Sequence, residues 1–387
     1  MTEFLAFDEL TWPAVEQLRR DIPLVIPLGS GYSKTRLVDC LGHPDIIGIL
    51  PEIPYGWRGS GLAVPERILQ PLLVNLLDSL SEDGFTNVRC LCPQDMGIDL
   101  GSRRIILPHP SQSQPHAPLP DIEDSRKVVV IPIGHTEQHG YHLPLSTDTL
   151  IIGSIADGVT KQLPLLACNL PAWPYGVSTH RQAFAGTLNA GGRAFEDFWL
   201  AVLDVLVARG FDRMYLLSGH GGNCSFLHNV VKYAGERHRR IFCATSWLYL
   251  SDTQGAKVLD QYRQSPIGGM GHACELETSL ILHLRRDLVD MDSVVDETNF
   301  IATPNYYMDW NEGGALIANP PWDDDSKTGA YGAGSLATTE KGMMWLEAAI
   351  QEKSAHVLEI HEQHERREER RNSGYGRWGR PSHQGSR

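Results

Sequence analysis

The sequence lacks several features that would define its class at once. No apolar run reaches the roughly eighteen residues that a membrane-spanning helix needs, so we expect no membrane span and no membrane partner. The seven cysteines include no Cys-x-x-Cys pair and no spacing typical of a secreted disulfide framework, so we expect reduced thiols. The first residues, Met1-Thr2-Glu3, show neither a basic region nor an apolar core. We therefore expect no signal peptide and a cytoplasmic location.

Positive charge is also in short supply. The chain has 34 Lys and Arg against 47 Asp and Glu, which gives a formal net charge of −13. This balance argues against a nucleic acid or an anionic membrane as the partner. The 387 residues leave room for one large or two medium domains with an ample core.

What the sequence does contain is a concentration of metal-binding residue types. Glu137 and His139 follow the apolar run 128–133, which predicts a buried strand, and Asp148 comes shortly after. The end of such a strand is where open α/β sheets place their ligands. A mixed set of carboxylate and imidazole donors suits Zn²⁺, Mn²⁺ or Fe²⁺ better than Ca²⁺. The alternative is a polar loop capped by Asp148.

Two further segments carry similar residue types. A second apolar strand leads into the Gly-rich turn that holds His220, where glycine lets the backbone approach a ligand closely. Residues 271–279 open an apolar-periodic helix and contain Glu275 and Glu277. These two glutamates point in different directions on a helix, so at most one faces a given metal ion.

Together these segments resemble the creatininase (creatinine amidohydrolase) family. The motifs that carry the resemblance occur in the family's order over about residues 125–350: Gly134-His135-Thr136-Glu137-Gln138-His139-Gly140, Leu143-Pro144-Leu145-Ser146-Thr147-Asp148, Tyr175-Gly176-Val177-Ser178, Phe184-Ala185-Gly186-Thr187, Gly219-His220-Gly221-Gly222-Asn223 and His272-Ala273-Cys274-Glu275-Leu276-Glu277-Thr278-Ser279. The resemblance implies an α/β fold with a mainly parallel sheet flanked by helices. It also implies a metal-dependent hydrolase of cyclic amides or formamides, with two divalent ions (Zn, Mn or Fe) that share one aspartate, in a homo-oligomer.

The resemblance also implies a ligand set. Glu137, Asp148 and His220 would hold one ion, while His139, Asp148 and a further glutamate would hold the second. In creatininase that glutamate lies two residues after the histidine of the Gly-His turn, where this chain has Gly222. Relatives with Gly-His-Gly-Gly-Asn take a glutamate from the His-Ala-x-Glu segment, which predicts Glu275. The chain thus resembles the formamide-hydrolysing and peptide-trimming branch more than creatininase itself.

Two histidines are candidates for moving a proton to the leaving nitrogen. His272 matches the family's catalytic histidine, and imidazole titrates near the working pH of most enzymes. His180 is the second candidate. The alternatives are that His272 only caps the following helix and that His180 only lines a loop.

Four residues are tentative contacts for the substrate. Tyr175 and Ser178 belong to the Tyr-Gly-x-Ser motif of the resemblance. Trp322 and Tyr331 lie in predicted loops and could stack on a flat ligand, although aromatic loop residues more often make packing or subunit contacts. We expect the substrate to be a small-molecule amide.

The amino-terminal part reads as an imperfect repeat of the catalytic part. Residues 22–30 echo residues 128–135, and residues 53–56 echo residues 173–176. The first copy has no Glu-x-His motif, and Asp95 stands where His220 would be. We therefore expect a metal-free pseudo-copy, unless the likeness only reflects the chemistry that all strand–helix units share. The expected organisation is a pseudo-copy (1–105), a Pro- and Ser-rich linker (106–124), a catalytic domain (125–356) and a charged, disordered tail (357–387).

The sequence therefore predicts a metal-dependent amidohydrolase with a dinuclear site that hydrolyses a C–N bond outside peptides. Two alternatives stay open. The metals could serve a non-hydrolytic reaction, or the fold could be a pseudoenzyme scaffold.

Overall fold

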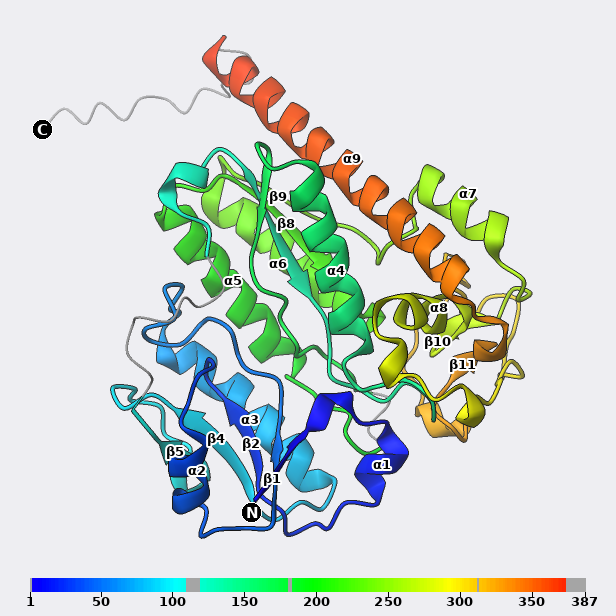
Figure 1. The fold of residues 1–387 in the computed structure, drawn as a ribbon. Coiled ribbons are helices and arrows are strands. Elements are labelled where there is room, and N and C mark those ends of the chain that lie inside the picture. The colour runs from blue at the N-terminus through cyan, green and yellow to red at the C-terminus, as the bar shows by residue number, and fades with distance from the viewer. Residues whose placement is uncertain (1, 109–118, 180–182, 312, 374–387) are drawn as a thin grey trace, which may run out of the picture.

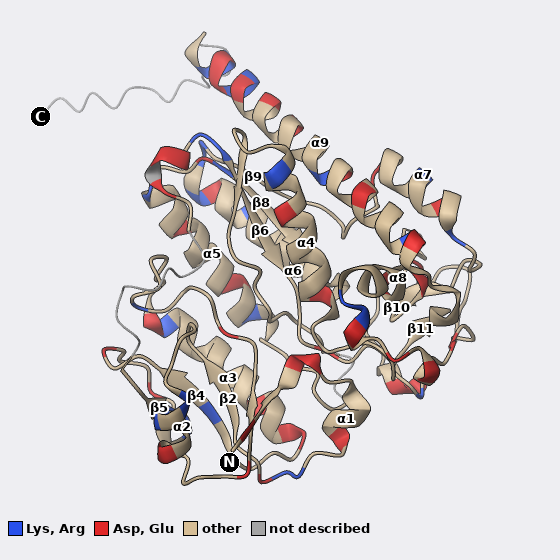
Figure 2. Cartoon of the chain, viewed as in Figure 1, with Lys and Arg blue, Asp and Glu red and all other residues tan. Residues whose placement is uncertain are grey.

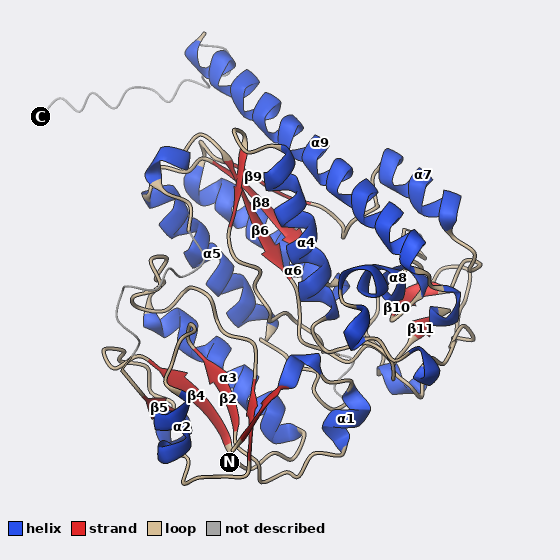
Figure 3. Ribbon diagram, viewed as in Figure 1, coloured by secondary structure: helices blue, strands red, loops and turns tan. Residues whose placement is uncertain are grey.

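The computed structural model describes residues 2–108, 119–179, 183–311 and 313–373. Two separate parallel sheets, one in each half of the chain, form its framework (Figures 1 and 3). Helices cover both, so the fold is α/β as the sequence predicts. Among the described residues, no helix is both long and apolar enough to cross a membrane. Acidic and basic residues are interspersed along both halves (Figure 2).

The amino-terminal half contains a five-stranded sheet with the order β1-β3-β2-β4-β5, and every pairing in it is parallel. Its elements are β1 (Glu3–Ala6), α1 (Trp12–Glu16), β2 (Leu24–Pro27), α2 (Lys34–Cys40), β3 (Ile46–Ile49), α3 (Glu66–Glu82), β4 (Val88–Cys92) and β5 (Arg104–Ile106). The long α3 covers one face of this sheet, while the short α2 covers the other.

The carboxy-terminal half contains a four-stranded parallel sheet with the order β7-β6-β8-β9 and a small antiparallel pair, β10 and β11. Its elements are β6 (Val128–Ile133), α4 (Thr147–Gln162), β7 (Ala167–Asn169), α5 (Gly192–Ala208), β8 (Arg213–Ser218), α6 (Gly221–His238), β9 (Phe242–Thr245), α7 (Thr253–Tyr262), β10 (Met270–His272), α8 (Glu275–Leu284), β11 (Tyr331–Gly332) and α9 (Thr339–Asn372).

Strand β6 shows why the second sheet is covered on both sides. All six of its residues are buried. Val129 and Ile131 face a core shared with α5, whereas Val128 and Val130 face a core shared with α4 and α9. Side chains alternate between the two faces of a strand, so a continuous apolar run requires a helical layer on each face.

One hydrophobic core joins the two halves of the chain. It contains Ile26 and Leu72 from the first half together with Phe198 and Trp199 from the second. The side chain of Tyr55 packs against Trp199, with ring centroids 6.3 Å apart. The amino-terminal half is therefore packed against the carboxy-terminal half through apolar surface.

The carboxy-terminal segment differs from the expected disordered tail. Helix α9 continues to Asn372 and is visible as the long helix at the top of Figure 1. Val357 and Ile360 are buried, and the His361 ring is hydrogen-bonded to Arg213 and to the Leu166 carbonyl. The charged composition concealed an apolar helical stripe that ends at Ile360, and the helix continues beyond it through polar residues to Asn372. Residues 374–387 and the linker residues 109–118 lie outside the described part.

The two sheets share a strand order. Strands β3-β2-β4-β5 have the same order of neighbours as β7-β6-β8-β9. Pro27 pairs with Leu91, and the corresponding Pro132 pairs with Leu217. This is what an internal repeat predicts, although its origin by duplication stays a proposal. His220 lies three residues after Leu217, and Gln94 lies three residues after Leu91. Gln94, and not the expected Asp95, therefore occupies the position that corresponds to His220.

Candidate metal centre

The carboxyl ends of the strands in the second sheet gather the candidate ligands. Glu137 and His139 come after β6, and His220 comes after β8. Asp148 lies in the first turn of α4, and Glu277 lies in the first turn of α8. Parallel strands direct their carboxyl ends to the same edge of a sheet, which is the usual ligand site of open α/β folds.

Two glycines allow the strand ends to approach α4. A Cβ atom on Gly134 would lie 2.4 Å from the Cα of Thr149. A Cβ atom on Gly219 would lie 2.5 Å from the carbonyl oxygen of Asp148. Neither position has room for a side chain, so these glycines permit the close packing that brings Asp148 to the ends of β6 and β8.

The Asp148 carboxylate lies between two imidazoles. Its Oδ1 is 3.2 Å from His139 Nε2, and its Oδ2 is 3.3 Å from His220 Nδ1. Glu137 Oε1 lies 2.8 Å from the same nitrogen of His220. Glu277 Oε1 lies 3.8 Å from His139 Nε2. Atoms that share one tetrahedral zinc ion are roughly 3.3–3.5 Å apart for bond lengths of about 2.0–2.2 Å. The two separations of Asp148 are close to this range, whereas that of Glu137 is shorter and that of Glu277 is longer.

Hydrogen bonds fix the direction of both imidazole rings. His139 Nδ1 lies 3.1 Å from the Glu137 carbonyl oxygen, and His220 Nε2 lies 3.0 Å from the Val177 carbonyl oxygen. Each of these nitrogens must donate, because a carbonyl oxygen only accepts. The remaining nitrogen of each ring faces the carboxylates. Metal-binding histidines are commonly held in this way by a carbonyl behind the ring.

The centre concentrates negative charge in a buried place. Glu137, Asp148 and Glu277 are each at most 3% exposed. Burial by itself lowers the pKa of His139 and His220, but the carboxylates around them outweigh it and raise both to about 9. Without a metal ion both rings are therefore doubly protonated, and so positively charged, near neutral pH. A divalent cation can replace those protons and neutralise the carboxylates, as metal sites require.

Glu277 takes the place expected for Glu275. The Glu275 carboxylate points away from the centre, where it pairs with Lys341 Nζ at 2.5 Å and accepts a hydrogen bond from the Ser265 backbone amide. Two residues apart on a helix, the glutamates face different sides, and the structure turns Glu277 toward His139. The expectation for Glu275 is corrected on this geometry. A Cβ atom on Gly222 would lie 2.4 Å from the Val177 carbonyl oxygen, which leaves no room for a ligand there.

His272 also faces the centre. Its Nε2 lies 2.7 Å from the Gln138 carbonyl oxygen, and its Nδ1 lies 3.9 Å from Glu137 Oε1. Its ring centroid is 4.2 Å from that of His139. Glu137, His139 and His272 also form a possible ligand group. The position suits both a proton carrier and a ligand. The other catalytic candidate, His180, lies outside the described residues.

The tentative substrate contacts fall into two groups. Tyr175 is buried and donates a hydrogen bond to the Pro51 carbonyl at 2.5 Å, so it connects the two halves instead of lining an open site. Ser178 is fully buried. Trp322 packs edge-on against His272, with ring centroids 5.9 Å apart, and Tyr331 packs against Trp322 at 5.6 Å. The two aromatic residues are therefore the ones nearest to the candidate proton carrier.

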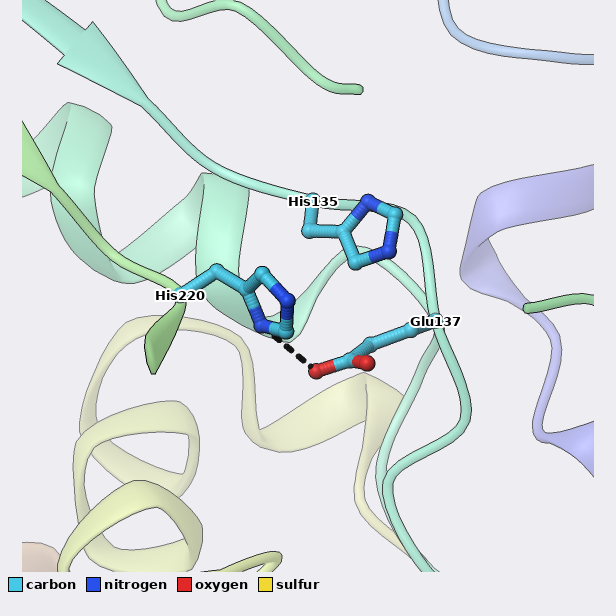
Figure 4. Close-up of side chains that lie close together, drawn as sticks. All are labelled: His135, Glu137 and His220. Carbon is cyan, nitrogen blue, oxygen red and sulfur yellow. Dashed lines mark ion pairs between the residues drawn. The ribbon is translucent and has the colours of Figure 1, made fainter. Parts of the chain in front are cut away.

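Sequence reasoning assigned no role to His135, a buried histidine that lies beside the candidate ligands. With Glu137 and His220 it forms another group of close ligand-type atoms, drawn in Figure 4. A usable signal was present, because His135, Glu137 and His139 alternate along an extended segment and alternate residues point to the same side.

The fold and the site together define the class of protein: an α/β protein with a buried centre of carboxylates and imidazoles at the ends of parallel strands. The sequence profile of the creatininase family, described as creatinine amidohydrolase, matches residues 116–357. The chain belongs to the creatininase family.

Individual relatives show similarity over part of the chain. Creatinine amidohydrolase from Pseudomonas putida is 28% identical over 244 residues, which cover 58% of this chain and 86% of that protein. The mycofactocin precursor peptide peptidase from Mycobacterium ulcerans is 32% identical over 176 residues, which cover 42% of this chain and 61% of that protein. The 3-dehydro-scyllo-inosose hydrolase from Thermotoga maritima is 26% identical over 240 residues, or 58% of this chain and 74% of that protein.

Solved structures of creatininase share the fold. A manganese form matches with a TM-score of 0.52 at 24% identity and covers 62% of this chain and 92% of that chain. A mutant creatininase of the Zn-Zn type gives the same values. The neighbours therefore contain metal ions, and the fold that holds them is the fold of this chain.

Proposed function

We propose that the protein is a metal-dependent amidohydrolase that uses two divalent ions to hydrolyse a C–N bond of a small molecule, a cyclic amide or a formamide. The observation that carries the proposal is the position of Asp148, whose two oxygens each face a different histidine. A carboxylate in that position can bridge two ions. Membership of the creatininase family supports the reaction class.

The ligand assignment rests on the distances. Glu137, Asp148 and His220 would hold one ion, and His139, Asp148 and Glu277 the other. Bound divalent ions would supply activated water at neutral pH and polarise the amide carbonyl. The protein's contribution is to keep these donors buried and fixed, which removes the cost of rearranging them during the reaction.

His272 is our candidate for protonating the leaving nitrogen. The backbone carbonyl oxygen of Gln138 lies 2.7 Å from His272 Nε2, closer than the Gln138 side-chain amide nitrogen at 3.2 Å, and so favours a proton on Nε2 and a lone pair on Nδ1, which faces the centre. Trp322 packs against the ring and limits its motion. A group fixed in this way can accept a proton from the centre and pass it to a nitrogen bound there.

Removal of a terminal peptide segment is the second candidate function. It is favoured by the relatives that are 31–34% identical to this chain and are named mycofactocin precursor peptide peptidases. Those matches cover 40–43% of this chain. Both candidates would use the same ions and the same proton carrier, so substrate size distinguishes them.

The test combines metal analysis with a substrate screen. Wild-type protein loaded with Zn²⁺, Mn²⁺ or Fe²⁺ should bind close to two ions and convert a lactam, cyclic ureide or formamide into a product heavier by one water. Conversion of peptides alone would favour the second candidate. A product of unchanged mass would indicate a non-hydrolytic reaction. Absence of metal and turnover would indicate a scaffold. Asp157→Asn, on the exposed side of α4, is the matched control for Asp148→Asn.

A further inference from the structure

His135 lies directly beside the candidate metal ligands. It comes shortly after the end of β6 and is 0% exposed. Its ring centroid is 4.5 Å from that of His220. A nitrogen of each ring and a carboxylate oxygen of Glu137 all lie within 4.8 Å of one another. In Figure 4 the Glu137 side chain extends toward His220, and the His135 ring lies next to both.

The hydrogen bond behind the His135 ring has the opposite direction to those behind His139 and His220. The backbone N–H of Gly176 donates to His135 Nδ1 at 2.8 Å. A ring nitrogen that accepts a hydrogen bond carries no proton, so the proton of the His135 ring is on Nε2. His139 and His220 instead donate to carbonyl oxygens and offer a lone pair to the centre. His135 is therefore built as a donor and is not suited to bind a metal ion.

One short segment, residues 176–177, sets the direction of the hydrogen bonds of both the His135 and the His220 rings. Gly176 donates to His135, while the carbonyl of the next residue, Val177, accepts from His220. The Val177 amide donates to the Asn223 side-chain oxygen at 3.0 Å, which fixes the segment. A Cβ atom on Gly176 would lie 2.5 Å from that same oxygen, so glycine is required here. The two imidazoles are thus held rigidly with opposite hydrogen-bonding roles.

We propose that His135 is a positioning residue of the metal centre: once Glu137 binds a metal ion, the Nε2–H of His135 donates to the Glu137 carboxylate, which lies within 4.8 Å of a nitrogen of this ring, and holds it in its metal-binding orientation. The inference rests on the proposed function, because it presumes that Glu137 binds a metal ion. Ligating carboxylates generally receive such hydrogen bonds, and loss of an outer partner typically lowers metal affinity about 10–100-fold.

Two substitutions separate this role from a purely structural one. His135→Asn places an amide oxygen near the former Nδ1, so it keeps an acceptor for Gly176 but has no donor at the position of Nε2. His135→Gln places an amide nitrogen near the former Nε2, so it keeps the donor but loses the acceptor. The measurement is a Zn²⁺ titration in competition with a chelating dye, with the optical spectrum of the Co²⁺-loaded protein as a second readout.

We expect His135→Asn to bind two zinc ions with an affinity about 10–100-fold below that of the wild type. The same variant should change the Co²⁺ spectrum, because the Glu137 carboxylate would no longer be held. His135→Gln should restore both the affinity, to within a few-fold, and the spectrum. Thermal melting of the metal-free variants checks that each one is folded.

Three results would overturn the inference. These are unchanged affinity in His135→Asn, a greater loss in His135→Gln than in His135→Asn, and the binding of one ion fewer by His135→Asn, which would make His135 a ligand. A wild-type protein that binds no divalent ion would instead refute the proposed function, so the two failures are distinguishable.

Discussion

The two sheets of this protein have the same strand order but differ in the side chains at the ends of their strands. After β6 the chain supplies Glu137 and His139, whereas after β2 it supplies Ser33, whose hydroxyl accepts a hydrogen bond from the Arg36 amide and caps α2. After β8 comes His220, whereas Gln94 occupies the corresponding place after β4. Shared backbone topology thus does not carry the chemistry, which depends on the residues placed at the strand ends.

The two halves also differ in what covers their sheets. The outer face of the first sheet carries only the seven-residue α2 and a small core. The corresponding face of the second sheet carries α4 and α9, with α8 packed against both. Asp148 comes from α4 and Glu277 from α8. A metal centre of this kind therefore needs helices that the described part of the amino-terminal half does not have.

The amino-terminal half has a different use, which is to support the loops of the centre. The carbonyl oxygens of Asp8 and Leu10 accept hydrogen bonds from the backbone amides of Ser146 and Leu145, each at 2.9 Å. These residues come shortly before Asp148 in the chain. The Asp83 carboxylate accepts a hydrogen bond from the Gly186 amide at 2.8 Å. One half carries the candidate metal ligands, and the other holds segments that lie close to them in the chain.

Removing the amino-terminal half should have the largest effect. A chain that lacks residues 1–105 would expose the apolar side chains of α5, among them Phe198 and Trp199, which are fully buried. Each fully buried large apolar side chain contributes about 1.5–3 kcal/mol, so exposing several of them should remove much of a net stability of about 5–15 kcal/mol. We expect aggregation or a changed oligomer in size-exclusion chromatography. A soluble, well-folded fragment with unchanged assembly and metal content would show that the second half is independent.

Asp148→Asn should remove metal binding at the strand ends of the second sheet, the property that distinguishes it from the first sheet, while leaving the fold in place. The amide is almost isosteric but cannot bridge two cations. We expect elemental analysis to show loss of both ions and turnover to fall about 10³-fold or more, since several kcal/mol of electrostatic stabilisation are lost. Asp157→Asn on the same helix should change neither. Retention of two ions by Asp148→Asn would contradict the bridging role.

Glu277 and Glu275 form a matched pair with opposite expected effects. Glu277→Gln should weaken binding of the second ion, because its oxygen faces His139. Glu275→Gln should leave metal content near normal but lower stability by about 3 kcal/mol, because it leaves the Lys341 ammonium buried without its partner. Metal analysis and thermal melting of the same two variants provide the comparison. A loss of metal confined to Glu275→Gln would reverse our assignment.

His272→Gln should retain the metals and lower turnover about 10²–10⁴-fold, the usual contribution of a positioned proton carrier. The pH–rate profile should lose one of its limbs. His283→Gln, on helix α8 and exposed, is a control with no expected effect. If His272→Gln loses an ion, His272 is a ligand, as its distance from Glu137 also allows.

Much of this arrangement could be predicted from local sequence patterns. The apolar run 128–133 gives β6 with the expected bounds. The motif residues Glu137, His139, Asp148 and His220 come together in the structure. Motifs at the ends of adjacent parallel strands converge by the rules of the fold, which is why they could be found without coordinates.

The remaining features depended on contacts between distant residues. The choice between Glu275 and Glu277 is decided by Lys341, which lies on α9 and pairs with Glu275. The direction of the His135 ring is decided by the Gly176 amide, 41 residues further along the chain. Neither partner can be identified from local periodicity, because both are brought in by tertiary packing.

The effect that needs no substitution concerns pH and again distinguishes the two halves, because within the described residues only the second has imidazoles among buried carboxylates. Burial lowers the pKa of His139 and His220, yet the carboxylates outweigh it and raise both to about 9 in the metal-free protein. Below that pH a divalent ion must displace a proton from each ring, so apparent affinity should rise with pH by up to about tenfold per unit for each proton displaced. It should level off above about pH 9. Titration with a chelating dye from pH 6.5 to 9.5, with the release of protons followed at each pH, measures this slope. An affinity that stays constant over this range would show that the two rings hold no displaceable protons, and would place the metal ions elsewhere.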